Sequence, residues 1–168
     1  MKNLEIKARC GNWRRIVKAL GKLGARRLAP MRQIDTYFRV PAGRLKLRQF
    51  NSKRAELIYY RRPEGRDQRW SDYTILPAAP PARWRGTLEK ALGVKAVVDK
   101  RRIVYLHRNA RIHLDNVKGI GRFVEIEVVV RKDAGQARRV MAELLQAFGI
   151  PRADFIRQSY SDMNRARK

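Results

Sequence analysis

The sequence contains five segments in which charged or ionisable residues recur at every second position. Their members are Glu5, Lys7 and Arg9; Arg44, Lys46 and Arg48; Lys100 and Arg102; Arg111, His113 and Asp115; and Glu125 and Glu127. Apolar residues fill most of the alternate positions, such as Leu4, Leu47 and Ile126. A period of two predicts β-strands with one charged and one apolar face. Because both signs of charge repeat in this way, several such strands can line a cavity that holds cations and a polyanion together.

Composition predicts a single folded domain over residues 1–168 with an anionic partner. The hydrophobic share is 44%, which is enough for a core, and 40 Lys and Arg residues against 15 acids give a formal charge of +25. The charge alone does not distinguish nucleic acid, polyphosphate, nucleotide and an acidic membrane. The single Cys10 excludes an internal disulfide. With no signal peptide or apolar run of about 20 residues, we expect a cytoplasmic protein without a membrane span.

Eight strands and three helices are expected along the chain. Residues 3–9, 33–40, 44–50, 55–62, 70–76, 94–107, 110–117 and 122–131 have strand character. Residues 13–23, 82–92 and 134–148 have helical spacing, and each of these segments is followed by a glycine. Around Ser159 and Tyr160 we expect only a locally ordered patch.

The charged faces have two interpretations. For any single strand, an ordinary sheet with its polar face in water is the better expectation. However, rows of like charge repel, as in Arg44, Lys46 and Arg48. A barrel with its charged faces inward and its apolar faces under the helices resolves this conflict. Its acids would offer the hard oxygen ligands that Mg²⁺ or Mn²⁺ prefers: Glu5, Asp115, Glu125 and Glu127. Its bases would hold phosphate oxygens: Lys7, Arg9, Lys46, Arg48, Arg61, Lys100 and Arg102.

Two uncharged or weakly basic side chains are further candidates. His113 is expected on the inward face, as a general base, a ligand or a hydrogen-bonded lining residue. Tyr59 shares the parity of Arg61, so it can stack on a base, donate to a phosphate or simply pack. No P-loop sequence is present, so any phosphate site has to be built from side chains.

These elements together resemble the CYTH superfamily, which includes class IV adenylyl cyclases, thiamine triphosphatases and inorganic triphosphatases. The segment from Asn3 to Lys7 resembles the family's Glu-x-Glu-x-Lys signature, and Arg111–Asp115 with Gly119–Glu127 resembles its acidic hairpin. Within the superfamily the class IV cyclase branch is the most similar. The resemblance implies an α+β fold, an eight-stranded antiparallel triphosphate tunnel flanked by helices.

The resemblance also implies roles for individual residues. The metal positions are Glu5, Asp115, Glu125 and Glu127, for Mg²⁺ or Mn²⁺. We assign catalysis to Lys7, Lys100 and Arg61, and triphosphate binding to Arg9, Arg44, Lys46, Arg48, Tyr59, Arg102, Arg111 and His113. One departure is Asn3, which stands where the signature has its first Glu, so we expect weaker or altered metal binding.

Two classes of function follow from this reading. The first is a metal-dependent enzyme acting on a triphosphate, either a cyclase that converts ATP to cyclic AMP and pyrophosphate or a hydrolase of thiamine triphosphate or tripolyphosphate. The alternative is a non-catalytic module that binds nucleic acid, nucleotide or polyphosphate, and it is motivated by the charge of +25. A homodimer is also expected if the helices leave part of the apolar outer surface bare.

Overall fold

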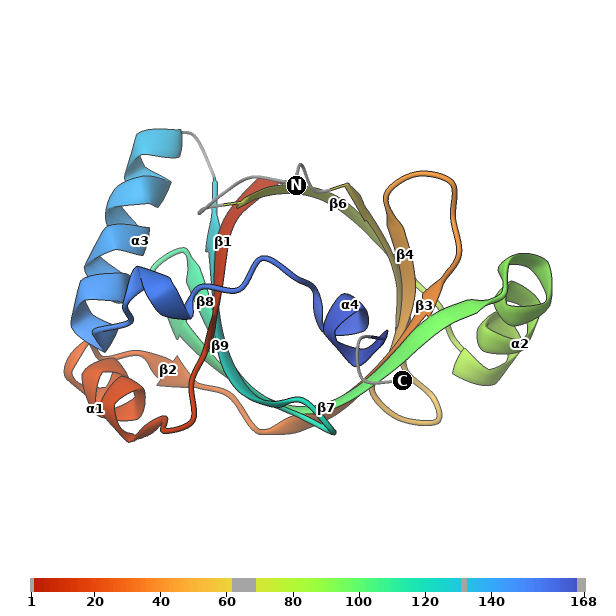
Figure 1. Cartoon of the computed structure of the whole chain (residues 1–168), viewed down its shortest axis with the longest axis horizontal. Helices are drawn as coiled ribbons and strands as arrows, with labels where there is room; N and C mark the ends of the chain where they lie inside the picture. The colour runs from red at the N-terminus through yellow and green to blue at the C-terminus, as the bar shows by residue number, and fades with distance from the viewer. Residues whose placement is uncertain (1, 62–68, 131–132, 166–168) are drawn as a thin grey trace.

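The main element of the protein is one antiparallel sheet whose eight longer strands close into a ring (Figure 1). The computed structural model describes residues 2–61, 69–130 and 133–165. The strands are β1 (Lys2–Arg9), β3 (Met31–Phe38), β4 (Arg44–Gln49), β5 (Ala55–Arg61), β6 (Arg69–Pro77), β7 (Val94–His107), β8 (Ala110–Val117) and β9 (Gly121–Val129). Their order is β7-β3-β4-β5-β6-β1-β9-β8, and pairing of β8 with β7 completes the ring. The predicted eight-stranded antiparallel α+β barrel is confirmed.

The three longer helices lie outside the ring on two sides (Figure 1). Helices α1 (Arg14–Lys22) and α3 (Ala134–Phe148) contact each other on one side, and α2 (Pro81–Leu92) lies on the opposite side. Helix α3 begins where the Asp133 carboxylate accepts hydrogen bonds from the backbone N–H groups of Gly135 and Gln136, at 2.7 and 3.0 Å. It ends at Gly149, whose φ of 60° is the left-handed conformation that glycine adopts without strain.

The largest hydrophobic cluster lies outside the barrel wall, and a smaller one reaches into the interior through Ile58 and Tyr60. The outward residues of β1, β8 and β9, such as Leu4, Ile112 and Ile126, are fully buried beneath α1 and α3. Leu20 of α1 and Leu144 of α3 close over them. Each such side chain contributes roughly 1.5–3 kcal/mol by leaving water. The inward faces of these strands therefore carry the charged residues, as the alternation predicts.

Three short elements were not predicted. Strand β2 (Arg26–Arg27) pairs with β7, a 3₁₀ turn spans Arg152–Asp154, and α4 (Tyr160–Arg165) replaces the expected ordered patch. All are too short to show a periodicity in sequence. The predicted ends of two strands at residues 62 and 131 lie outside the described residues.

The C-terminal segment crosses one mouth of the ring. Phe155 bridges to Ala8 of β1, and the N–H of Ile156 donates to the carbonyl of Lys7 at 2.8 Å. Helix α4 then lies against β7, where Asn164 Nδ2 donates to the carbonyl of Val97 at 2.8 Å (Figure 1). This route brings Tyr160 to the barrel interior. No helix in the described part of the chain is long and apolar enough to cross a membrane.

Candidate active site in the barrel interior

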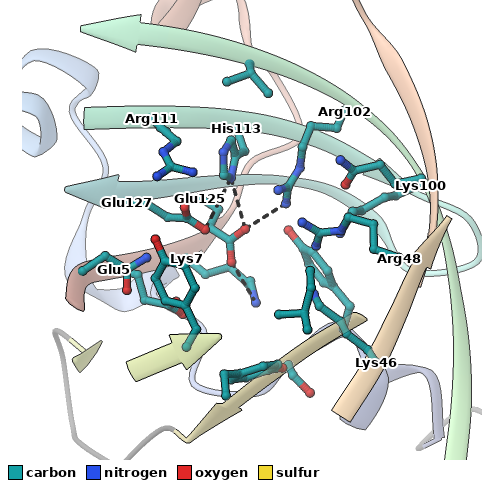
Figure 2. Close-up of a pocket in the computed structure, with 18 of the residues that line it drawn as sticks. Glu5, Lys7, Lys46, Arg48, Lys100, Arg102, Arg111, His113, Glu125 and Glu127 are labelled. Carbon is teal, nitrogen blue, oxygen red and sulfur yellow. Dashed lines mark hydrogen bonds and ion pairs between the residues drawn. The ribbon is translucent and has the colours of Figure 1, made fainter. Parts of the chain in front are cut away.

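A cavity of about 310 Å³ occupies the barrel interior and receives side chains from all eight strands of the ring. Figure 2 shows its charged residues in two groups. Acids and a histidine lie on one wall, from Glu5, His113, Glu125 and Glu127, together with Lys7 and Arg111. Bases lie on the facing wall, from Lys46, Arg48, Lys100 and Arg102. One cavity therefore presents cation ligands opposite anion ligands.

The strand register explains the acidic wall. Residues directly opposite each other on neighbouring strands share a face of the sheet. Strands β1, β9 and β8 form two such rows, which run Glu5–Glu127–Arg111 and Lys7–Glu125–His113. Each row thus places acids beside a base or an imidazole.

Three donor groups on this wall fit a divalent cation. One ligand atom from each of His113, Glu125 and Glu127 can be chosen so that all three lie within 4.8 Å of one another. Two ligands on opposite sides of one small ion are about 4.2 Å apart, since each bond is about 2.1 Å long. The separations within this group are close to that spacing. Glu5, opposite Glu127 in the register, is buried on the same wall.

Asp115, the fourth predicted metal position, is not brought into this group. Its two carboxylate oxygens accept from Nε and Nη2 of Arg102, both at 2.6 Å, and Tyr160 Oη donates to Oδ2 at 2.9 Å. Burial alone would raise the pKa of Asp115, but the Arg102 guanidinium holds it below its ordinary value. Asp115 is therefore an ionised partner that fixes Arg102 and Tyr160.

Arg102 reaches Glu125 from the basic wall, and Lys7 reaches it from the neighbouring position on the acidic wall. Arg102 Nη2 donates to Glu125 Oε2 at 2.9 Å, and Lys7 Nζ lies 3.4 Å from Oε1. Burial would raise the pKa of Glu125, yet Lys7, His113 and Arg102 hold it well below its usual range. Lys7 Nζ also lies 4.2 Å from the centre of the Tyr160 ring. Glu125 is thus kept as an anion that links the two walls.

An acid that the sequence analysis did not assign to the site, Asp35, organises the basic wall. Its fully buried carboxylate accepts from Lys46 Nζ and Lys100 Nζ, each at 3.0 Å, and from Arg48 Nε and Nη2 at 2.9 and 3.0 Å. Burial would raise its pKa, but Arg48, Lys100 and Lys46 hold that pKa well below the ordinary value. The only signal in the sequence is a lone acid within a β-rich segment, Gln33–Val40.

The two lysines held by Asp35 have lowered pKa values. Burial, followed by the nearby Arg48, lowers the pKa of Lys46 to about 7, although Asp35 opposes the shift. Burial also lowers the pKa of Lys100 to about 8. An anion that enters the cavity would favour the charged form of both groups.

Four predicted substrate or catalytic residues are not part of the cavity lining. Arg9 Nη1 donates to the carbonyl of Ile120 at 3.3 Å, and Arg44 Nη2 donates to Asp162 at 2.8 Å. Arg61 is exposed and its Nε donates to Tyr59 Oη at 3.1 Å. The structure therefore places Arg9, Arg44, Tyr59 and Arg61 apart from the facing walls, whereas Lys7, Lys46, Arg48, Lys100, Arg102, Arg111 and His113 come together.

The register of β5 explains the position of Tyr59 and Arg61. Lys46 of β4 is paired with Ile58, so Ile58 shares its inward face and Tyr60 follows two residues later. Tyr60 and Tyr73 line the cavity in place of Tyr59. The sequence of β5, AELIYYR, mixes polar and apolar residues at both parities, so alternation could not choose its inward face.

An antiparallel barrel with a charged interior cavity defines the class of protein. The CYTH domain family model matches residues 1–160. The chain therefore belongs to the CYTH family.

Solved structures share this fold. A protein from Pyrococcus horikoshii is 23% identical, with 95% of this chain and 98% of that chain covered and a TM-score of 0.85. A candidate adenylate cyclase from Vibrio parahaemolyticus is 19% identical, with 97% of each chain covered and a TM-score of 0.79. A candidate adenylyl cyclase from Hippeastrum, described as having a dominant triphosphatase activity, is 16% identical, with 99% and 96% covered and a TM-score of 0.65. No curated protein matches the chain significantly in sequence.

Proposed function

We propose that this chain is a divalent-metal-dependent enzyme that acts on a triphosphate compound inside the barrel. The observation that carries the proposal is the pair of facing walls, with His113, Glu125 and Glu127 on one and four bases on the other. A divalent ion held by such acids bridges phosphate oxygens and neutralises the charge that develops in phosphoryl transfer. Family membership supports the same proposal.

The bases are positioned before any substrate arrives. Asp35 holds Lys46, Lys100 and Arg48, so these side chains do not have to be ordered at binding. Each ammonium has three N–H donors and directs one of them at Asp35, which leaves the others for phosphate oxygens. Arg102, fixed by Asp115, extends the same wall toward Glu125.

The uncharged part of the cavity favours an organic triphosphate over tripolyphosphate. Ile58 and Tyr60 of β5 and Tyr73 and Ile75 of β6 form an apolar and aromatic strip in the lining. Such a strip suits the base or ring of ATP or thiamine triphosphate, and tripolyphosphate has no group to place there. Whether a ribose hydroxyl or water attacks depends on which nucleophile the bound substrate aligns.

The proposal is tested by incubating the protein with Mn²⁺ and, separately, ATP, thiamine triphosphate and tripolyphosphate, and resolving the products. Cyclic AMP with pyrophosphate identifies a cyclase, and release of phosphate identifies a hydrolase. Lys100→Gln should lower kcat/KM by about 10²–10³-fold, because it removes a charged contact to phosphate. Arg101→Gln, on the exposed face of the same strand, is the matched control and should leave it unchanged. Turnover of none of the three substrates would overturn the proposal.

A binding function remains the second candidate because the charge excess lies outside the cavity. Inside the barrel the acids nearly match the bases, so the +25 is carried mainly by the exterior. No acid occurs between Glu5 and Asp35, a stretch that holds, apart from Lys7 in the cavity, Arg9, Arg14, Arg15, Lys18, Lys22, Arg26, Arg27 and Arg32. A labelled oligonucleotide titrated across salt concentrations tests this function. Simple phosphate attraction collapses as salt rises, so tight binding at physiological salt would support it.

A further inference from the structure

The imidazole of His113 faces two carboxylates inside the barrel. Its Nδ1 lies 3.4 Å from Glu125 Oε2 and 3.8 Å from Glu127 Oε1, and its side chain is only 6% exposed. The contact with Glu125 is a long hydrogen bond, beyond the 2.7–3.2 Å of a good N–H···O bond. The two spacings also lie within the range of donor atoms that share a small cation, since two ligands on one ion lie up to about 4.2 Å apart.

A second observation on the same wall is compatible with a bound cation. Asn3 is 4% exposed, lines the cavity and precedes Glu5 by two residues on the inward face of β1. Its Oδ1 is buried and has no hydrogen-bond partner among the residues described. An unsatisfied buried acceptor costs roughly 1–3 kcal/mol. A metal ion or a water molecule bound to that ion would satisfy it.

The donor set determines which ion is favoured. Mg²⁺ prefers an all-oxygen shell, whereas an imidazole nitrogen adds affinity for first-row transition ions, least for Mn²⁺ and more for Co²⁺ and Zn²⁺. Asn3 brings a neutral oxygen where the Glu-x-Glu-x-Lys signature has a carboxylate. This wall therefore has one negative charge fewer than the signature provides, and it attracts Mg²⁺ less strongly. A nitrogen ligand offsets the lost attraction only for those ions that bind imidazole.

We propose that His113 is a direct ligand of the metal ion, together with Glu125 and Glu127, and that this nitrogen makes the site selective for Mn²⁺, Co²⁺ or Zn²⁺ over Mg²⁺. This inference rests on one part of the proposed function, the binding of a divalent ion inside the barrel. It assigns to His113 a role that goes beyond lining the cavity.

The test uses the full chain loaded with Mn²⁺ and pulsed electron paramagnetic resonance. An imidazole bound to Mn²⁺ gives a ¹⁴N coupling in the echo modulation, and we expect one. The chain has two histidines, and His107 lies at the end of β7 outside the cavity lining. His113→Gln should therefore abolish the coupling, and the matched variant His107→Gln should retain it. Calorimetry should show that His113→Gln lowers Mn²⁺ affinity at least about tenfold and Mg²⁺ affinity much less.

Labelling the wild-type protein with ¹⁵N-histidine gives a readout that needs no substitution. The ¹⁴N coupling should be replaced by that of ¹⁵N, so a variant that fails to fold does not decide the question. If Mn²⁺ binds and supports turnover but no nitrogen coupling is seen, or if His113→Gln retains it, the His113 proposal is overturned and the proposed function stands. If Mn²⁺ does not bind at all, both are overturned.

Discussion

Asp35→Asn is expected to be among the most damaging conservative substitutions in the barrel. The variant keeps the size of the side chain but removes the one carboxylate that Lys46, Lys100 and Arg48 share. Removing one partner of a buried ion pair costs about 3–5 kcal/mol, because the remaining charge is left uncompensated. The two lysines can lose a proton, since burial already lowers the pKa of Lys46 to about 7 and that of Lys100 to about 8. Arg48 cannot, so a substantial cost persists at every accessible pH.

Urea unfolding at pH 7, followed by tryptophan fluorescence and circular dichroism, measures this cost. With a slope of roughly 2 kcal/mol per molar urea, a loss of about 4 kcal/mol lowers the midpoint by about 2 M. The matched control is Asp99→Asn, whose carboxylate pairs with the exposed Arg32 at 2.7 Å. An exposed pair contributes less than about 1 kcal/mol, so this midpoint should move by less than about 0.5 M.

The deficit of Asp35→Asn should also depend on pH. Without the carboxylate, which raises the pKa of both lysines, these values fall further in the folded variant. The folded variant then binds fewer protons than the folded wild type, and the stability difference narrows as pH rises from about 6 to 9. A midpoint shift no larger than that of Asp99→Asn, or a deficit that grows with pH, would refute the reasoning.

Three further predictions concern the same interior. The folded-state pKa of Lys46 lies at about 7, below the ordinary 10.5, so its contribution to stability should increase as pH rises from 7 to 10.5. Thermal unfolding of Lys46→Met should therefore show a smaller increase of stability with pH than the wild type. An equal increase contradicts the lowered pKa of Lys46. Asn3→Glu should raise divalent-metal affinity in calorimetry because it adds a carboxylate beside Glu5; no gain counts against a metal at this wall. Arg102→Lys keeps the charge but loses the paired hydrogen bonds to Asp115, so urea unfolding should show that the free energy of unfolding falls by about 1–3 kcal/mol. Wild-type stability would contradict a structural role for the paired guanidinium–carboxylate bonds.

The inward faces of most strands were predictable from sequence because side chains alternate strictly across a sheet. Glu5 and Lys7, or Glu125 and Glu127, needed only their spacing and their apolar neighbours to be placed together. The helix ends were equally local, since Asp133 and Gly149 act within a few residues of their own positions. The rows of like charge indicated a barrel with its charged faces inward, and the resemblance to the CYTH superfamily implied an eight-stranded antiparallel tunnel; the pairing of β7 with β8 closes the observed ring.

The charge partners could not be predicted because they join residues far apart in the chain. Asp35 and Lys100 are 65 positions apart, and the pairing of β3 with β7 brings them into contact. Asp115 and Tyr160 are 45 apart, and the return of the C-terminal segment to the barrel brings them together. The face of β5 was also undecided until its pairing with β4 set its register.

The sequence by itself thus determined which strands carry charge and which of their faces are apolar, because those properties depend on near neighbours. Only the tertiary structure decided which charges neutralise one another. Asp35 and Asp115 contact the bases, whereas His113, Glu125 and Glu127 are grouped on one wall, because these contacts depend on which strands pair and on their register.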